Sequence, residues 1–213
     1  MAECLVSNAL TTIERVKDEL GVSYDNNSID ETLIRYINEA TDFIEEETGR
    51  VFGKISNKIE VVGGSADNYL LLKGRPILVV NEILYGTEAI TNFLVDADDY
   101  KAGMVYRDVG WTKSSYIVGL TGDQFGTRRN YTVDYDYGYI LPKDVTDQVA
   151  QTLPRSLEAI AIKLVVLKHR ENQRQSHGLK ELKQGRLTLK FTGELLSARE
   201  FSTLQKYKKI GVW

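Results

Sequence analysis

The chain has 213 residues, 42% of them hydrophobic and 27% charged, and a formal net charge of −3. This length suits one sizeable core, or a compact domain with an arm, in a globular protein folded in a reducing cytosol. The single cysteine, Cys4, excludes an internal disulfide, two histidines leave a structural zinc site almost without ligands, and the longest apolar run, 159–167, is too short to span a bilayer.

Two helices are predicted near the start of the chain. Thr11 with Glu14 reads as a capping box and Gly21 as a helix stop, which together predict a helix at 12–20. A second box, Ser28 with Glu31, opens a longer helix predicted at 29–48. This helix carries one apolar stripe and is expected to pack along its whole length; the stripe consists of Leu33, Ile37, Ala40 and Ile44.

Between residues 55 and 139 the hydrophobic period changes from helical to extended, and glycines separate the apolar runs. The strand candidates are 59–62, 69–72, 77–85, 89–95, 104–109, 116–120 and 130–139. Their lengths and spacings are uneven, which argues against a repeat architecture and indicates one small antiparallel β region.

The last of these segments, NYTVDYDYGY, alternates strictly. One face is predicted to carry Tyr131, Tyr135, Tyr137 and Tyr139 with Val133, and the other Asp134 and Asp136. A base-stacking platform would need cations near the rings, whereas here the opposite face is acidic. The tyrosine row is therefore interpreted as core or as a contact with another subunit.

A third helix is predicted at 154–174, after Pro154, and a C-terminal arm at 176–213 is predicted to hold a short strand and a last helix. A third capping box, Ser197 with Glu200, opens that helix. From Arg155 onward the net charge is +8, against −11 for the preceding 154 residues. Either one end of the molecule meets an acidic partner, or the tail is a solvated amphipathic segment.

No catalytic, cofactor-binding or metal-binding residues are predicted. His169 and His177 have no evident acidic partner nearby in sequence, and Cys4 lies close to the N-terminus. The glycine-rich segments lack the phosphate-binding spacings. The acidic cluster Asp96, Asp98 and Asp99 lacks the glycine that a calcium loop needs, although a hydrolase using this cluster remains a third hypothesis.

The order of these segments resembles the head-tail connector proteins of long-tailed double-stranded DNA bacteriophages, also called adaptor or head-completion proteins. The resemblance begins with LTTIERVKDELGV and SIDETLIRYINEATDFIEEETGRVF. It continues through LLLKGRPILVVNEILYG with its Gly-x-Pro turn, NYTVDYDYGY, and LPRSLEAIAIKLVVLKHRENQR. It covers most of residues 10 to 175, with a looser echo in LLSAREFSTLQKYKK.

The resemblance implies an α+β fold: a connector domain at 1–175, in which a bundle of three to four helices carries an inserted antiparallel β region at 55–139, followed by the basic arm. It implies a non-enzymatic virion protein of the neck, assembled in the host cytoplasm. It also implies a ring, commonly of twelve copies, beneath the capsid portal. The partners implied are the portal protein, a downstream neck or tail completion protein, and double-stranded DNA that passes through without sequence-specific binding; no membrane and no cofactor is implied.

Two regions depart from the pattern, because the β region is long and the arm matches only loosely. The candidate contacts of the arm with the portal or a neighbouring subunit are Lys206, Tyr207, Lys208, Lys209 and Trp213. The main alternative is a nucleic-acid-binding module that uses the basic C-terminal segment, which would show binding that weakens steeply as salt rises.

Overall fold

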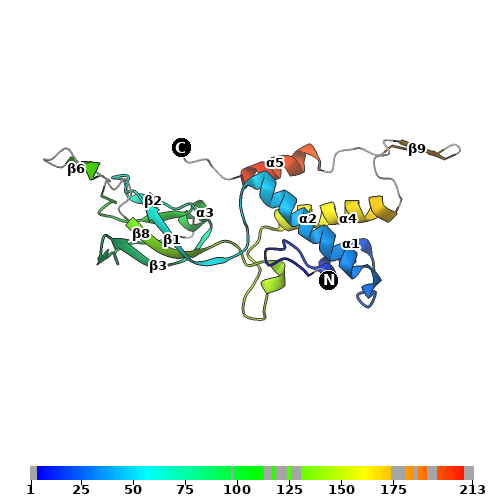
Figure 1. Ribbon diagram of the computed structural model, residues 1–213, viewed down its shortest axis with the longest axis horizontal. Coiled ribbons are helices and arrows are strands. Elements are labelled where there is room, and N and C mark those ends of the chain that lie inside the picture. Colours follow the sequence, from blue (N-terminus) through cyan, green and yellow to red (C-terminus); the bar gives the residue numbers. More distant parts are fainter. Residues whose placement is uncertain are drawn as a thin grey trace. The chain divides into compact units, whose positions relative to one another are not determined.

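The structure is a computed structural model, and it describes residues 4–96, 98–112, 117–118, 124–125, 131–173, 181–184, 187–190 and 196–208. The chain divides into two compact units (Figure 1). Unit 1 is formed by Met1–Gly53 together with Ile140–Trp213, and unit 2 by Lys54–Tyr139. The predicted α+β class is confirmed, since helices build unit 1 and antiparallel sheets build unit 2.

Unit 1 contains the helices α1 (Ile13–Leu20), α2 (Asp30–Thr48), α4 (Arg155–Gln173) and α5 (Ala198–Lys206). It also contains the 3-10 turns η1 (Asn27–Ile29) and η2 (Pro142–Asp144). Contacts between α2 and α4 join the two longest helices, and α1 and α5 pack against both of them. The four helices therefore pack around one core.

The core of unit 1 is built from the apolar stripes that the sequence predicts. The fully or nearly fully buried residues are Leu33, Ile37, Ala40 and Ile44 on α2, Leu157, Ile160, Ala161, Leu164 and Val165 on α4, Val16 on α1 and Leu204 on α5. Because these positions recur at i, i+3, i+4 and i+7, one side of each long helix faces the others. α2 ends at Gly49, whose φ of +64° suits the left-handed C-cap.

Two of the three predicted capping boxes are wrong. The N-cap of α1 is Thr12, one residue later than predicted, and its side chain makes no capping hydrogen bond. Before α2, the Asn26 side chain accepts a hydrogen bond from the backbone N–H of Ser28 and opens η1 instead. The predicted box at Ser197 and Glu200 is confirmed, with both reciprocal hydrogen bonds present.

Unit 2 is organised around β8 (Tyr131–Tyr137), an inner strand of a four-stranded antiparallel sheet. The order in this sheet is β1 (Ile55–Val62), β8, β3 (Ile77–Tyr85) and β4 (Glu88–Ala89). β2 (Tyr69–Leu71) pairs with β5 (Met104–Tyr106) in a second sheet, and α3 (Asp99–Ala102) precedes β5. β8, the last strand of the predicted β region, thus lies between β1 and β3 in the sheet.

The remaining strands form two short antiparallel hairpins. In unit 2, β6 (Ile117–Val118) pairs with β7 (Gln124–Phe125). In the C-terminal segment, β9 (Glu181–Gln184) pairs with β10 (Leu187–Lys190). The strand expected at 89–95 is wrong as a continuous element, because only Ala89 belongs to β4 and Leu94 makes a single bridge to Tyr106.

A polar clamp fixes the start of β1 against β8. The Asp136 carboxylate accepts a hydrogen bond of 2.8 Å from the backbone N–H of Asn57 and forms an ion pair of 3.2 Å with Lys54. Asn57 has a φ of +53°, and the pairing register shifts between Ile55 and Lys58. The bulge turns one more backbone N–H toward Asp136, and this hydrogen bond together with the ion pair explains how an aspartate can be buried in this strand.

Candidate functional site

The tyrosine row of β8 is part of the core of unit 2. Tyr131 and Tyr135 are 1% and 0% exposed, and Trp111 packs edge-on against Tyr131 with ring centroids 5.1 Å apart. The backbone N–H of Thr112 donates a hydrogen bond of 2.8 Å to the Tyr131 hydroxyl. These rings cannot serve as a stacking platform, because protein atoms already cover their faces.

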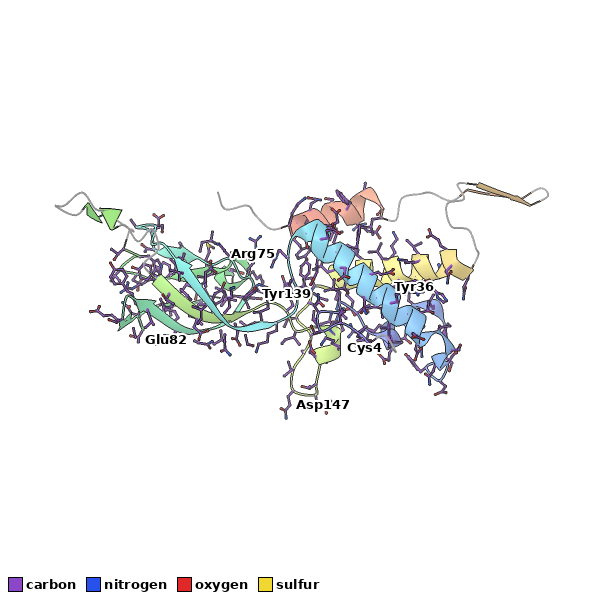
Figure 2. The ribbon with its side chains drawn as sticks, viewed as in Figure 1. Cys4, Tyr36, Arg75, Glu82, Tyr139 and Asp147 are labelled. Atoms are coloured by element: carbon purple, nitrogen blue, oxygen red, sulfur yellow. The ribbon has the colours of Figure 1, made fainter. Side chains whose placement is uncertain are left out.

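The other two tyrosines of the row are less buried. Tyr137 is half-buried, with its ring centroid 5.5 Å from that of Tyr135, and Tyr139 is half-buried just beyond the end of β8 (Figure 2). Both make further interactions within the chain. Of the four predicted residues, these two are the ones that keep surface for another subunit.

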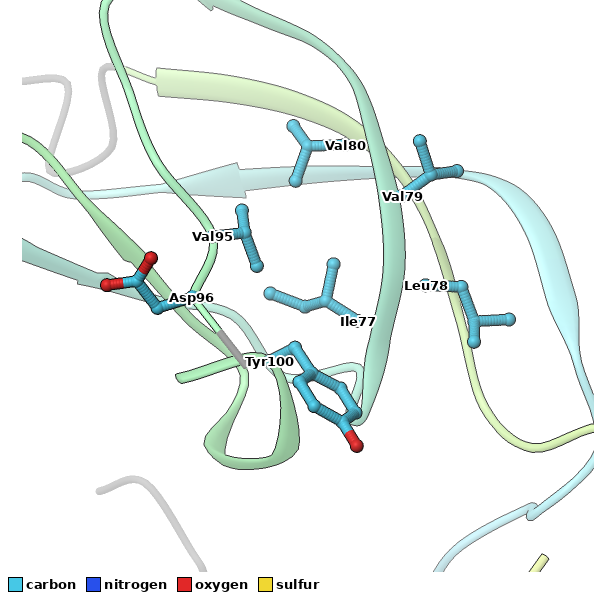
Figure 3. Close-up of a pocket in the computed structure, with 7 residues that line it drawn as sticks. All are labelled: Ile77, Leu78, Val79, Val80, Val95, Asp96 and Tyr100. Atoms are coloured by element: carbon cyan, nitrogen blue, oxygen red, sulfur yellow. The ribbon is translucent and has the colours of Figure 1, made fainter. Parts of the chain in front are cut away.

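One open pocket lies beside the first half of β3 (Figure 3). Its volume is about 330 Å³. The lining residues are Ile77, Leu78, Val79, Val80, Val95, Asp96 and Tyr100. The lining is apolar with one carboxylate and one phenol, so it offers neither a nucleophile paired with a base nor a set of metal ligands.

The acidic cluster of the sequence marks the start of α3. Asp98 is its N-cap and Asp99 lies in its first turn, where carboxylates favour the positive end of the helix dipole. The backbone C=O of Asp96 accepts a hydrogen bond from Tyr100. Among the described residues, His, Cys, Asp and Glu side chains nowhere gather in a group that could hold a metal ion.

Within the part of the chain that the structure describes, His169 and Cys4 do not come together in a reactive group. His169 is 5% exposed on α4, burial lowers its pKa, and its Nε2 lies 2.9 Å from the side-chain amide of Gln173. His177 lies outside the described residues. Cys4 is exposed, and its backbone C=O accepts a hydrogen bond from Asn38.

The charge asymmetry along the sequence is partly cancelled within unit 1. Lys168 on the basic α4 pairs with Glu39 on the acidic α2, and its ammonium lies 5.4 Å from the ring centroid of Tyr36. Arg15 on α1 pairs with Glu158 on α4. Helices that are distant in sequence thus bring some of their opposite charges together.

The C-terminal helix docks on its own chain. Lys163 on α4 donates hydrogen bonds of 2.7 and 2.6 Å to the two carboxylate oxygens of Glu200. This contact holds the pKa of Glu200 at about 2, with the Ser197 hydroxyl and N–H as further donors. Leu204 is 1% exposed and contributes the apolar part of the contact.

The predicted arm residues lie in different surroundings. Tyr207 packs edge-on against Phe52, with ring centroids 6.3 Å apart, and its backbone C=O accepts a hydrogen bond of 3.4 Å from Arg50. Lys206 and Lys208 are exposed. Lys209 and Trp213 lie outside the described residues.

The sequence reasoning missed Lys163 and Leu204. The capping box identifies Glu200, yet nothing near it in sequence points to a partner 37 residues earlier. The amphipathic pattern of the last helix could have predicted that Leu204 is buried.

The helical and first extended segments match a known family. Residues 10–71, which contain α1, α2, β1 and β2, match the family model described as phage gp6-like head-tail connector protein. A comparison with curated proteins found no match. No described helix is long and apolar enough to cross a membrane.

Solved structures of gene transfer agent (GTA) particles include chains similar to this one. One, from the neck of an empty GTA particle computed with C6 symmetry, has 12% identity and a TM-score of 0.45. A second, from the virion of a native GTA particle, has 11% identity and a TM-score of 0.49. A third, from the neck of a native GTA particle computed with C12 symmetry, has 12% identity and a TM-score of 0.46.

Each of these matches covers 100% of this chain and 96% of the other. The predicted resemblance to head-tail connector proteins is confirmed for residues 10–71, the part of the chain that the gp6-like family model matches.

Proposed function

We propose that the protein is a structural, non-enzymatic component of the virion neck that joins head to tail. The single observation that carries the proposal is the gp6-like connector match over residues 10–71.

We further propose that twelve copies form a ring that binds beneath the portal and prolongs its DNA channel. A ring subunit must bury surface against two neighbours. Tyr137 and Tyr139 are the tyrosines of the β8 row that are only half-buried, and they are proposed as part of such a contact. A downstream neck or tail component would bind the opposite rim of the ring.

We assign portal docking to the exposed cations of the arm. Lys206 and Lys208 are exposed, while Tyr207 packs on Phe52. In this arrangement Tyr207 holds the end of α5 in place, and the residues that meet an acidic collar are Lys206, Lys208, Lys209 and Trp213. Rim cations of this kind affect association rate and salt dependence more than they affect the lifetime of the complex.

The test is assembly on the portal. Purified protein mixed with its portal should give an added ring in electron micrographs and a matching mass in native mass spectrometry. The triple variant Lys206→Glu, Lys208→Glu, Lys209→Glu should bind the portal more weakly, while the charge-matched variant Lys58→Glu, Lys73→Glu, Lys101→Glu should bind as the wild type does. A monomer in solution alone would not contradict the proposal, but failure to associate with portal at low salt would.

The nucleic-acid-binding alternative is tested on the same material. Fluorescence anisotropy with duplex DNA should show little binding by the intact protein. Tight binding that falls steeply between low and moderate salt would favour the alternative instead. The pairing of Lys168 with Glu39 and of Lys163 with Glu200 already occupies two cations of the C-terminal half with carboxylates of the same chain.

A further inference from the structure

Four residues of unit 1 form the surface on which α5 docks. We define the α5 seat as Arg50, Phe52, Ser156 and Lys163, which contact α5 or the residue that follows it. Lys163 binds both carboxylate oxygens of Glu200, and the Ser156 hydroxyl lies 3.4 Å from that of Tyr207. All of these contacts join the helix to the seat, and none involves the segment that connects α4 to α5.

The connection is much longer than docking within one chain requires. Lys163 precedes the end of α4 at Gln173 by ten residues, so α5 has to return only about 15 Å along that helix. The connection between Gln173 and Ala198 has 24 residues. Even with 181–190 folded back on itself as a hairpin, the other 14 could reach about 45 Å. The length of the connection therefore allows α5 to reach a seat on another copy that lies within about 45 Å of the end of α4.

The hairpin within this connection does not fix the path of α5. β9 and β10 pair with each other and with no other strand in the part of the chain that the structure describes. A two-stranded hairpin alone is marginally stable in water. Among the described strands, pairing of the hairpin with a strand of unit 2 therefore does not fix the path of the chain from α4 to α5.

We propose that in the assembled ring α5 of one copy occupies the α5 seat of its neighbour. The inference rests on the proposed function, because it requires copies held side by side. The occupant is a second copy of this chain, and the complementary groups are Glu200, Leu204 and Tyr207 of one copy with Lys163 and Phe52 of the next.

The exchange costs little because it reuses the same contacts. A helix that swaps between copies keeps its buried leucine, its ion pair and its ring contact, and each seat remains filled. Closing a connection of 24 residues within one chain is only slightly more favourable than binding between tethered neighbours, since closure entropy changes slowly with length. Every exchanged helix then links two adjacent subunits without any new surface.

The ion pair itself permits a direct test. Wild-type protein is prepared with nitrogen-14 and with nitrogen-15, mixed in equal amounts, assembled on portal and treated with a carbodiimide. This reagent joins an amine and a carboxylate into an amide with loss of water, and it acts on ion pairs such as Lys163 with Glu200, whose side chains are 40% and 26% exposed. The linked peptides are then sorted by isotope.

Exchange predicts Lys163–Glu200 links that combine the two isotopes in the assembled fraction. The matched control is the Lys168–Glu39 pair between α4 and α2 of one chain, whose links should carry a single isotope. Single-isotope Lys163–Glu200 links in assembled rings would overturn the inference while leaving the proposed function intact. Absence of any ring on the portal would instead contradict the proposed function, and the inference with it.

Charge reversal gives a second, independent measurement. Lys163→Glu and Glu200→Lys should each lose assembly on portal, because seat and helix then repel each other. An equal mixture of the two variants should regain assembly if helices exchange, since each seat then meets a complementary helix from the other variant. The double variant Lys163→Glu, Glu200→Lys controls for folding and should assemble alone. A mixture no better than either single variant would argue against exchange.

Discussion

The hydroxyl of Tyr135 joins two segments of unit 2 by donating a hydrogen bond of 2.7 Å to Glu60 and accepting one of 2.9 Å from the backbone N–H of Gly74. Tyr135→Phe removes this hydroxyl and leaves the buried N–H of Gly74 without its acceptor. We expect the free energy of unfolding to fall by about 1–3 kcal/mol. Urea denaturation measures the loss, and Tyr69→Phe, at a side chain 44% exposed, is the control that should change it little.

The same hydroxyl predicts a dependence on alkaline pH. Burial, then the hydrogen bond to Glu60, raises the pKa of Tyr135 above its ordinary value of 10.0. Above pH 10 the unfolded chain releases a proton that the folded chain retains, so unfolding becomes more favourable as pH rises. Stability measured at several alkaline pH values should therefore fall more steeply for the wild type than for Tyr135→Phe. Equal slopes would show that this hydroxyl does not contribute.

Gly74 is required where the Gly-x-Pro turn meets β8. A Cβ at this position would lie 2.5 Å from ring carbons of Tyr137 and 2.6 Å from the Tyr135 hydroxyl. Gly74→Ala must displace one of the rings, and we expect a cost of about 1–3 kcal/mol in denaturation experiments. Gly86→Ala isolates backbone strain, because Gly86 has a φ of +62° and open space around its Cβ, and it should cost about 1 kcal/mol.

Leu204 is the apolar anchor of α5. Leu204→Ala removes most of a side chain that is 1% exposed, at a typical cost of about 2–5 kcal/mol for a buried leucine. Because α5 is a short terminal helix, we expect it to detach while the remainder of unit 1 stays folded. Amide hydrogen exchange should then accelerate across α5 and not across α2. Phe201→Ala, at a residue 45% exposed, should leave exchange nearly unchanged.

Docking of α5 should also weaken in acid. The hydrogen bonds from Lys163, then those from Ser197, hold the pKa of Glu200 at about 2, below its ordinary value of 4.5. The contribution of Glu200 is complete above pH 4.5 and is lost as pH falls from 4.5 toward 2, where the docked carboxylate finally takes up its proton. The methyl resonances of Leu204 report docking by NMR. Glu200→Gln should remove the change in this window, and a change that persisted would need another titrating group.

Local periodicity was sufficient to predict the main helices and strands, including β8 with its alternating aromatic and acidic side chains. The stripe of Leu33, Ile37 and Ile44 predicts the buried side of α2 because a helix repeats every 3.6 residues. Sequence could not place Asp136 in a buried clamp, since that depends on a bulge at Asn57 some 79 residues away. It likewise could not pair Lys163 with Glu200, because surface charges have many possible partners until packing selects one.

The ladder partners Ile55 and Tyr137 stand at the two ends of unit 2, where the chain enters it and where it leaves. During synthesis the whole sheet thus emerges from the ribosome before Arg155–Gln173 does. All strands of the inserted sheet are available early, whereas the apolar faces of α1 and α2 stay exposed until α4 has been synthesised. Chaperones that bind exposed apolar helices should consequently contact the nascent chain at α1 and α2 rather than at its strands.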